Sequence, residues 1–316
     1  MQPRARTGLL AVVAVIAIFA YLFVNIGSNW SYVLSRRGAE ILAIMITGGA
    51  IGYSTLVFQT ITNNRILTPS IIGLDSLYLL IQTVIIFLLG SSTFTMIDSQ
   101  VNFLISVGLM ILFSGVLYKV LFRREGQNIY FLLLIGLIFG ILFDSIASFM
   151  QVLIDPNEFL VVQDRMFASI NNINRDLLFI ASILMLVVLG YSVRFFKYLD
   201  VLSLGKEQAI NLGVDYDYVV KRLLIVVAVL VSISTALIGP ITFLGLLVVN
   251  VAYEFLKTYR HRYLTAGSVL IGIIALAAGQ LIVKEVFTFS TTLSVIVNFI
   301  GGVYFIYLLL KENRSW

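Results

Sequence analysis

Long apolar runs follow one another along almost the whole chain, separated by short polar segments. A membrane-spanning helix needs about 20 largely apolar residues to cross a hydrocarbon core of about 30 Å. Runs of this kind predict spans at residues 9–27, 41–62, 76–97, 99–121, 128–153, 177–196, 217–238, 241–256, 264–283 and 290–310. The pattern therefore predicts an all-α, polytopic membrane protein whose residues 1–316 form a single transmembrane domain.

The number of spans depends on the stretch from Leu223 to Tyr253, which carries no charged residue. As one helix this stretch would be ~46 Å long, well beyond the hydrocarbon core. Gly239 and Pro240 lie in its middle, and proline disfavours helix at its own position and at the residue before it. A tight reversal at Gly239-Pro240 predicts two spans here, and about ten transmembrane helices in all.

The distribution of basic residues predicts the orientation. Cytoplasmic loops of membrane proteins carry an excess of Lys and Arg, whereas acids contribute little. With ten spans and an internal N-terminus, 16 of the 21 Lys and Arg residues fall in cytoplasmic segments, and both termini are cytoplasmic. The net charge of +5 is therefore interpreted as a topology signal, with membrane lipid and no nucleic acid as its partner.

Composition excludes several kinds of site. The chain has no cysteine, which excludes disulfides and thiolate metal sites, and His261 is its one histidine. His261 lies between two arginines in a polar segment, so we expect a solvated loop residue. We expect no metal site and no cofactor bound by this chain. Without soft ligands the chain is also poorly suited to bind a bare metal ion, and a chelate that carries its own ligands fits better.

The motifs of ATP hydrolysis and of intramembrane hydrolysis are also missing. Gly205-Lys206 is the only Gly-Lys pair, and it is no phosphate-binding loop because Asp200 stands at the first glycine position and Glu207 follows the lysine. Neither paired carboxylates nor a serine with a base is visible at membrane depth. The chain is therefore not predicted to be an enzyme.

The long internal segment 197–221 is the most informative loop. Ser203 is expected to cap a short helix at 204–212, and Gly213 offers a left-handed C-cap. The apolar face of this helix would be lined by Leu204, Ala209 and Leu212. Spacing alone leaves two interpretations open: an interfacial helix that lies on the bilayer, or a small apolar surface presented to a soluble partner.

Three blocks of this sequence resemble, in the same order, blocks of the permeases that import iron-siderophores, haem and cobalamin. Residues 203–214, Ser-Leu-Gly-Lys-Glu-Gln-Ala-Ile-Asn-Leu-Gly-Val, are similar to their coupling segment Leu-Gly-x(4)-Ala-x(2)-Leu-Gly. Residues 58–73 resemble Gln-x(4)-Asn-Pro-Leu-Ala-x-Pro-x-x-Leu-Gly, and residues 239–246 resemble Gly-Pro-Ile-x-Phe-x-Gly-Leu. With the paired Gly301-Gly302 of the last span, the resemblance covers nearly the whole chain.

This resemblance implies the permease fold of a type II ABC importer in a bacterial cytoplasmic membrane. The permease would pair with a second permease, identical or related, between an ATPase dimer and an extracytoplasmic siderophore-binding protein. ATP would bind to the ATPase, and residues 200–215 would form the coupling segment that meets it. The coupling residues implied are Leu204, Gly205, Ala209, Leu212 and Gly213. Residues 63–69 look most like the petrobactin and anguibactin branch, which implies a ferric siderophore as cargo, moved by alternating access.

The sequence departs from the family pattern in two places. Where the family shows Arg-x-Pro-Arg before the second span, this chain has Arg36-Arg37-Gly38. The family's Pro-His and following Arg of the eighth span are replaced by Val249-Asn250 and Tyr253. Docking of the binding protein through Arg36, Arg37 and Lys284 is therefore a hypothesis that competes with ordinary interfacial anchoring.

The candidates for the transport pathway are polar residues of the spans and of the first family block: Gln59, Asn63, Asn64 and Asp144. Asp144 is the one acid placed well inside a predicted span, where charge is costly and usually faces protein or water. The alternative function is a secondary transporter driven by ions. Such a transporter would be expected to carry several acids inside the membrane.

Overall fold

The computed structural model describes residues 2–25, 30–96, 98–121, 129–171 and 173–312, and these are helical throughout apart from their connections. The elements are α1 (Pro3–Phe23), α2 (Trp30–Thr62), η1 (Pro69–Ile72), α3 (Leu74–Met96), α4 (Ser99–Leu121), α5 (Ile129–Leu153), α6 (Pro156–Met166), α7 (Arg175–Ser192), η2 (Val193–Phe195), α8 (Phe196–Leu202), α9 (Lys206–Asn211), α10 (Tyr216–Ile238), α11 (Leu244–Leu256), α12 (His261–Glu285) and α13 (Leu293–Glu312).

The helices agree with the predicted spans. Among the described residues, seven helices are long and apolar enough to cross a membrane. Three shorter apolar helices, Leu74–Gly90, Leu244–Leu256 and Leu293–Leu308, take the remaining predicted places. The largest difference is at α2, which begins at Trp30 and not at residue 41. The predicted ends at residues 27 and 97 and the predicted start at residue 128 lie outside the described residues.

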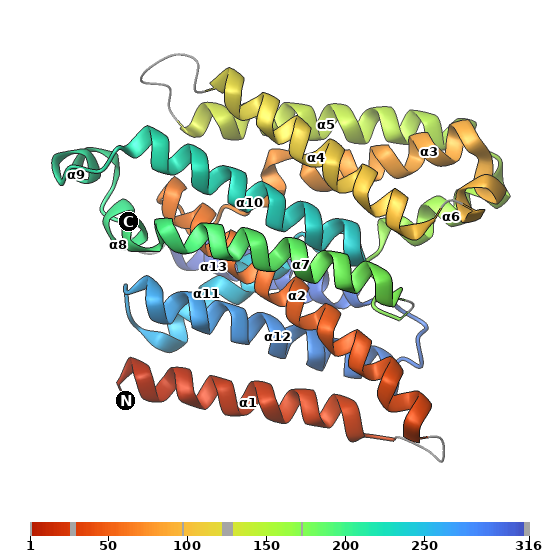
Figure 1. The fold of residues 1–316 in the computed structure, drawn as a ribbon, viewed down its shortest axis with the longest axis horizontal. Helices are drawn as coiled ribbons and strands as arrows, with labels where there is room; N and C mark the ends of the chain where they lie inside the picture. The colour runs from red at the N-terminus through yellow and green to blue at the C-terminus, as the bar shows by residue number, and fades with distance from the viewer. Residues whose placement is uncertain (1, 26–29, 97, 122–128, 172, 313–316) are drawn as a thin grey trace.

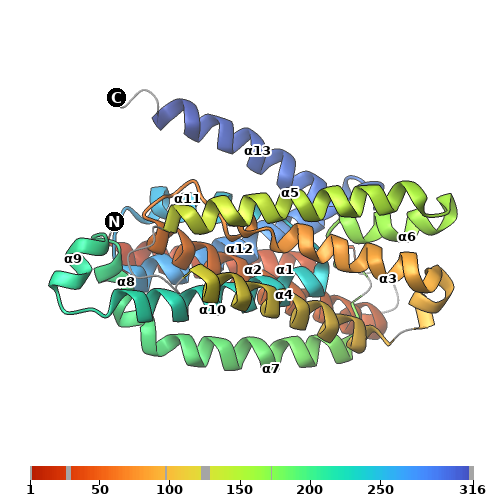
Figure 2. The same ribbon diagram turned by 90° about the horizontal axis from the view of Figure 1, so that it is seen from above.

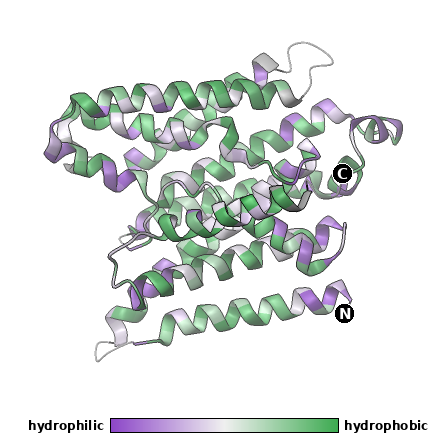
Figure 3. Ribbon diagram, turned by 180° about the vertical axis from the view of Figure 1, so that it is seen from behind, coloured by the Kyte–Doolittle hydropathy of each residue, from purple (hydrophilic) through white to green (hydrophobic). Residues whose placement is uncertain are grey.

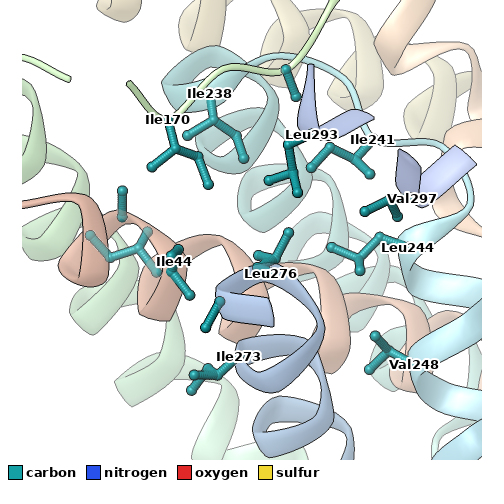
Figure 4. Packing of buried hydrophobic residues seen from close by; sticks show 14 of the residues in the cluster. Ile44, Ile170, Ile238, Ile241, Leu244, Val248, Ile273, Leu276, Leu293 and Val297 are labelled. Carbon is teal, nitrogen blue, oxygen red and sulfur yellow. The ribbon is translucent and has the colours of Figure 1, made fainter. Parts of the chain in front are cut away.

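The second helix, α2, lies in the middle of the bundle, whereas α1 lies at its edge (Figure 1). In the apolar window of α2, 83% of the residues are buried, against 17% in that of α1. Buried aliphatic residues join α2 to α12 and to the start of α11, with Ile44 near Leu276 and Ile273 (Figure 4). Apolar residues cover the lengths of the helices and polar residues gather at the two ends of the bundle (Figure 3), as expected for helices surrounded by lipid.

Glycines allow α2 and α12 to touch through their backbones. A Cβ atom added at Gly48 would lie 2.9 Å from the carbonyl carbon of Gly272, and one added at Gly52 would lie 2.8 Å from the carbonyl oxygen of Ser268. Membrane helices have no hydrophobic driving force toward each other, so close packing through small residues stabilises their contact. Gly301 likewise packs on Phe243, whereas nothing lies within 4 Å of a Cβ at Gly302.

The predicted reversal between the seventh and eighth spans is present. Gly239 ends α10 with φ of 100°, a conformation that glycine adopts without strain. A Cβ at Gly239 would lie 2.9 Å from the Cα of Ala168, which follows the surface helix α6. The backbone N–H of Ser169 donates to the carbonyl of Ile238 at 2.8 Å. The turn therefore packs against Ala168 and Ser169, about 70 residues earlier in the chain, and the sequence pattern did not predict this contact.

Between α2 and α3 the chain runs back into the bundle. Gly73, with φ of 82°, lies against Gly140 of α5, and Ile72 lies against Gly136. Gly140 is about 17 Å along α5 at ~1.5 Å per residue. Irregular residues 63–68 and the short 3-10 helix η1 therefore reach a point near the middle of a membrane-spanning helix, and α3 begins there.

Both ends of the chain lie at the same end of the bundle as α8 and α9 (Figures 1 and 2). This arrangement agrees with the predicted topology, in which the termini and the segment 200–215 share the cytoplasmic side. The same views show α13 standing away from the other helices over most of its length (Figure 2).

We predict that Gly48→Ala lowers the stability of the folded protein, because the added Cβ meets backbone atoms of α12 that cannot rotate away. The expected loss is about 1–3 kcal/mol, the usual cost of overpacking. The measurement is the thermal melting of the purified protein in detergent.

The matched control is Gly108→Ala on α4, where nothing lies within 4 Å of the new Cβ. Alanine favours helix over glycine by up to about 1 kcal/mol, so this variant should be neutral or more stable. Equal melting temperatures for both variants would contradict the backbone contact between α2 and α12.

Candidate coupling and transport site

A compact two-helix segment follows α7 at the cytoplasmic end. The prediction that Ser203 caps a helix at 204–212 is wrong: Ser203 follows the last residue of α8, and its hydroxyl donates to the carbonyl of Asp200 at 2.7 Å. The helix α9 covers only Lys206–Asn211 and starts after Gly205, which has φ of 99°. Gly213 has φ of 82°, so the predicted left-handed residue after the helix is confirmed.

The apolar residues of this segment point in two directions. Ala209 is fully buried against the protein, so it is not on a common exposed face with Leu204 and Leu212. Leu204 is 56% exposed, Leu212 is 64% exposed and Ile210 is 50% exposed. Ala209 thus packs α9 against the bundle, whereas Leu204, Ile210 and Leu212 are exposed at the cytoplasmic end. Their role in coupling stays a prediction.

The single histidine ties this segment to the bundle. The prediction of a solvated loop residue is wrong, because His261 is 2% exposed and is the first residue of α12. Asp200 of α8 accepts from the backbone N–H of His261 at 2.8 Å and lies 2.7 Å from its Nδ1. The other ring nitrogen, Nε2, lies 2.8 Å from the hydroxyl of Thr60 on α2. His261 therefore connects α8, α12 and α2.

A second link runs through the irregular segment after α2. Asn63, with φ of 48°, places its side-chain nitrogen 3.9 Å from where a Cβ on Gly205 would lie. Asn64 accepts from the N–H of Ile66 at 2.9 Å through its side-chain oxygen, and its own N–H donates to the carbonyl of Gln59 at 3.2 Å. Two pathway candidates thus shape the turn, and one of them lies beside the coupling segment.

The carbonyl of Arg65 is held from two sides. Gln59 donates to it from α2 at 2.7 Å, and Asn250 donates to it from α11 at 2.9 Å. The guanidinium of Arg65 lies over the ring of Tyr253, with 4.4 Å from its central carbon to the ring centroid. Arg65 stands where the family block has proline, and Tyr253 stands where the family has arginine. In this chain the guanidinium therefore comes from the segment after α2, and the aromatic ring comes from α11.

The first and third family blocks meet around a small cavity of ≈ 20 Å³. Thr68, Pro69 and Ser70 come from the first block, and Ile241, Thr242 and Gly245 come from the third. The remaining lining residues belong to α2, α3 and α10: Ile51, Ser54, Thr55, Asp75, Val231 and Thr235. The volume suffices for one or two water molecules and not for a chelate. In this conformation the two blocks thus close against each other.

Asp75 in this cavity was missed because the third span was predicted to begin at residue 76. The structure places Asp75 in the first turn of α3, where it accepts from the hydroxyl of Thr235 at 3.0 Å. Asp144 is consequently not the one acid within the spans. Asp144 is exposed and accepts from the hydroxyl of Ser76 at 2.9 Å, so it lies outside the cavity. Its role in the pathway stays a prediction.

At the opposite end of the bundle, the candidate docking residues differ from one another. Arg37 is 3% exposed, and its guanidinium donates to the carbonyls of Tyr21, Leu22, Val24 and Asn25, so it caps the end of α1. Arg36 is exposed, lies 3.3 Å from Glu40 and donates to the carbonyl of Asn171. Lys284 lies 3.8 Å from Glu285. Docking through these residues stays a prediction, and Arg36 is the one whose guanidinium reaches the surface.

The described residues include no group of three or more His, Cys, Asp or Glu side chains that could hold a metal ion. An apolar multi-span bundle, with an irregular segment inside it and a short helical segment at its cytoplasmic end, defines a multi-pass membrane transport subunit. The chain belongs to the FecCD transport family, whose profile matches residues 8–311.

Relatives of known annotation agree with this class. The chain is 65% identical to the petrobactin import system permease protein YclO of Bacillus subtilis (strain 168), over the full length of both chains. It is 37% identical to the petrobactin import system permease protein FatC of Bacillus anthracis, over 89% of this chain and 79% of the relative. A solved chain from a transporter assigned to the metal-chelate ABC type, in an inward-facing conformation, has the same fold. Its TM-score is 0.84 at 20% identity, over 98% of this chain and all of that chain.

We predict that Arg65 and Tyr253 stabilise each other. A double-mutant cycle of Arg65→Gln and Tyr253→Leu should give an interaction free energy of about 0.5–1 kcal/mol, the usual size of an exposed cation–π contact. The measurement is unfolding in mixed detergent micelles.

The control cycle pairs Arg65→Gln with Tyr32→Leu, because Tyr32 is an exposed tyrosine near the other end of α2. The effects of substitutions at distant sites on the free energy of unfolding are additive, so the interaction free energy of this cycle should be zero within about 0.5 kcal/mol. If the interaction free energy of Arg65 and Tyr253 is no larger than that of the control pair, the stacking of the two side chains does not stabilise the protein.

Proposed function

We propose that this chain is the permease subunit of an ATP-driven importer that carries a ferric siderophore across the cytoplasmic membrane. Membership of the FecCD family and full-length identity of 65% to a petrobactin import permease support this function. The alternative, a secondary transporter driven by ions, is not favoured by either finding.

One structural observation carries the proposal furthest. Leu204, Ile210 and Leu212 are exposed on a short segment at the end of the bundle where basic residues predict the cytoplasm. That segment is not a free loop, because Ala209 is buried and Asp200 bonds to His261. An apolar surface on a firmly attached segment suits a soluble partner that pushes on it. We therefore assign the ATPase dimer to this surface.

The mechanism follows from the attachments of that segment. A movement of α8 and α9, driven by closure of the ATPase dimer, would act on α2 and α12 through Asp200, His261 and Thr60. Since α2 is the central helix, such a movement reaches the cavity where the first and third family blocks close. This route supports alternating access, with the cargo path opened to one side at a time.

The other partners are proposed from exposed surfaces. The second permease would pack against α13, which stands away from its own bundle (Figure 2) and has exposed Phe299, Val303 and Leu310. The siderophore-binding protein would meet the outer end, where Arg36 is exposed and Arg37 is used within the subunit. The cargo would arrive as a chelate whose iron is already ligated, so this chain needs no metal ligands of its own.

We predict that Leu204→Asp uncouples the ATPase. Leu204 is 56% exposed, so the substitution leaves the bundle intact but puts a carboxylate into the proposed apolar contact. Burying an unpaired charge at an interface costs several kcal/mol, so substrate-stimulated ATP hydrolysis should fall at least ten-fold. The measurement is ATPase activity of the reconstituted complex with its binding protein.

The control is Tyr259→Asp, which places the same carboxylate on a 79% exposed residue of another cytoplasmic loop. This variant should keep full stimulation and the same amount of complex in the membrane. Normal coupling in Leu204→Asp would remove α9 from the ATPase contact.

The cargo is tested separately by uptake. In cells that lack their own ferric siderophore permeases, this chain with its partner subunits should support accumulation of radioactive iron supplied as ferric petrobactin. The same cells should take up little iron supplied as a ferric hydroxamate. Uptake of both, or uptake that persists when the ATPase subunit is inactivated by mutation, would contradict the proposed substrate class or energy source respectively.

A further inference from the structure

An open hollow of ≈ 310 Å³ lies at the cytoplasmic end of the bundle, between the first turn of α1 and the first turn of α12. Its walls are formed by Gln2, Pro3, Arg4, Thr258, Arg260 and Tyr263. None of these six residues is acidic, and two of them carry a guanidinium. Among the described residues, no carboxylate forms an ion pair with Arg4 or Arg260. The hollow therefore concentrates positive charge without internal neutralisation.

The surrounding contacts hold this hollow in shape. The Nε of Arg4 donates to the hydroxyl of Tyr263 at 3.1 Å, which orients the guanidinium. Two residues further along α1, Arg6 donates to the carbonyls of Phe255 and Leu256 at 2.9 and 3.1 Å, and so fixes the start of α1 to the end of α11. The hollow is therefore a built feature, formed by two elements that are more than 240 residues apart in the sequence.

The place of the hollow in the membrane decides what can occupy it. The lipid-facing apolar part of α1 begins a few residues later, with Leu9, Val12 and Val13 exposed at the edge of the bundle. A group bound beside Arg4 thus lies at the level of the lipid headgroups, and acyl chains attached to it can lie along α1. The cytoplasmic leaflet is the one that carries anionic lipids, which juxtamembrane Lys and Arg residues attract.

The donors suit a phosphate group. Guanidinium groups bind phosphate oxygens through paired, charge-assisted hydrogen bonds. In a zwitterionic headgroup, the cationic nitrogen group offsets part of the phosphate charge and so weakens this attraction. The hydroxyls of Thr258 and Tyr263 and the amide of Gln2 add neutral hydrogen-bonding groups to the same space. We infer that this hollow is a binding site for the phosphate headgroup of an anionic phospholipid of the cytoplasmic leaflet. The site is independent of the proposed transport function.

The inference is tested on the purified full-length chain by native mass spectrometry and by thermal melting in detergent with added lipid. Phosphatidylglycerol should bind and raise the melting temperature, and phosphatidylcholine should not. In the double variant Arg4→Gln/Arg260→Gln, affinity for phosphatidylglycerol should fall by at least ten-fold, since each arginine near an anionic surface contributes roughly five-fold.

The matched control is Arg194→Gln/Arg222→Gln, which removes two exposed arginines, one from η2 and one from the second turn of α10. This control should retain the affinity. An equal loss in both double variants would mean that only the general surface charge matters, and it would overturn the site. If the Arg4/Arg260 variant does not fold, Tyr263→Phe serves instead, because it removes only the hydroxyl that orients Arg4, and it should weaken lipid binding with little change in melting without lipid.

A further arm separates lipid from free phosphate. Inorganic phosphate at the same concentration should neither raise the melting temperature nor displace phosphatidylglycerol, because the acyl chains contribute to binding along α1. Stabilisation by phosphate alone, with no further effect of the lipid, would overturn the assignment to a lipid and leave an ion site.

Discussion

The constraint on which this structure depends is that irregular backbone inside a membrane must find its hydrogen bonds within the protein. Residues 63–68 leave the helical state, and the short 3-10 helix η1 that follows them reaches the middle of α5. Backbone groups inside the hydrocarbon region cannot turn to lipid, and an unsatisfied group there costs several kcal/mol. At the cytoplasmic start of this segment, Gln59 and Asn250 donate to the carbonyl of Arg65, one from each neighbouring helix. The polar residues of these spans therefore act first on the backbone of their own chain.

One substitution looks like the loss of a positive charge when the sequence is considered alone. The arginine of the family's eighth span is absent here, and Tyr253 stands in its place. The structure brings the guanidinium of Arg65 over the ring of Tyr253. Because Arg65 stands at a proline position of the family block, this chain has a backbone N–H there that must be satisfied or exposed. The contact between Arg65 and Tyr253 is not visible when the two positions are considered separately.

The sequence predicted the fold well because apolar length and basic-residue distribution are properties of each segment by itself. Gly239-Pro240 correctly divided the one ambiguous stretch, since glycine and proline act on the local backbone. The failures concern residues whose surroundings come from far along the chain. His261 looked solvated between two arginines, but its partners Asp200 and Thr60 are 61 and 201 residues away. The hydrogen bonds of Arg37 to the carbonyls at the end of α1 were likewise not predicted. No local signal identifies either contact.

The two links at the cytoplasmic end have a joint consequence for how motion can spread. Asp200 lies in α8 and accepts from the first N–H of α12, so α8 caps a helix to which it is not joined in sequence. The other ring nitrogen of His261 lies 2.8 Å from the hydroxyl of Thr60, which is in the last turn of α2. The segment that includes α8 and α9 is therefore bonded to the cytoplasmic ends of both α2 and α12. Because the backbones of α2 and α12 also pack closely at Gly48 and Gly52, a displacement of α8 would act on the two helices as a pair. Residues of α2 also line the cavity where the first and third family blocks meet, so this is the place where such a displacement would have its effect.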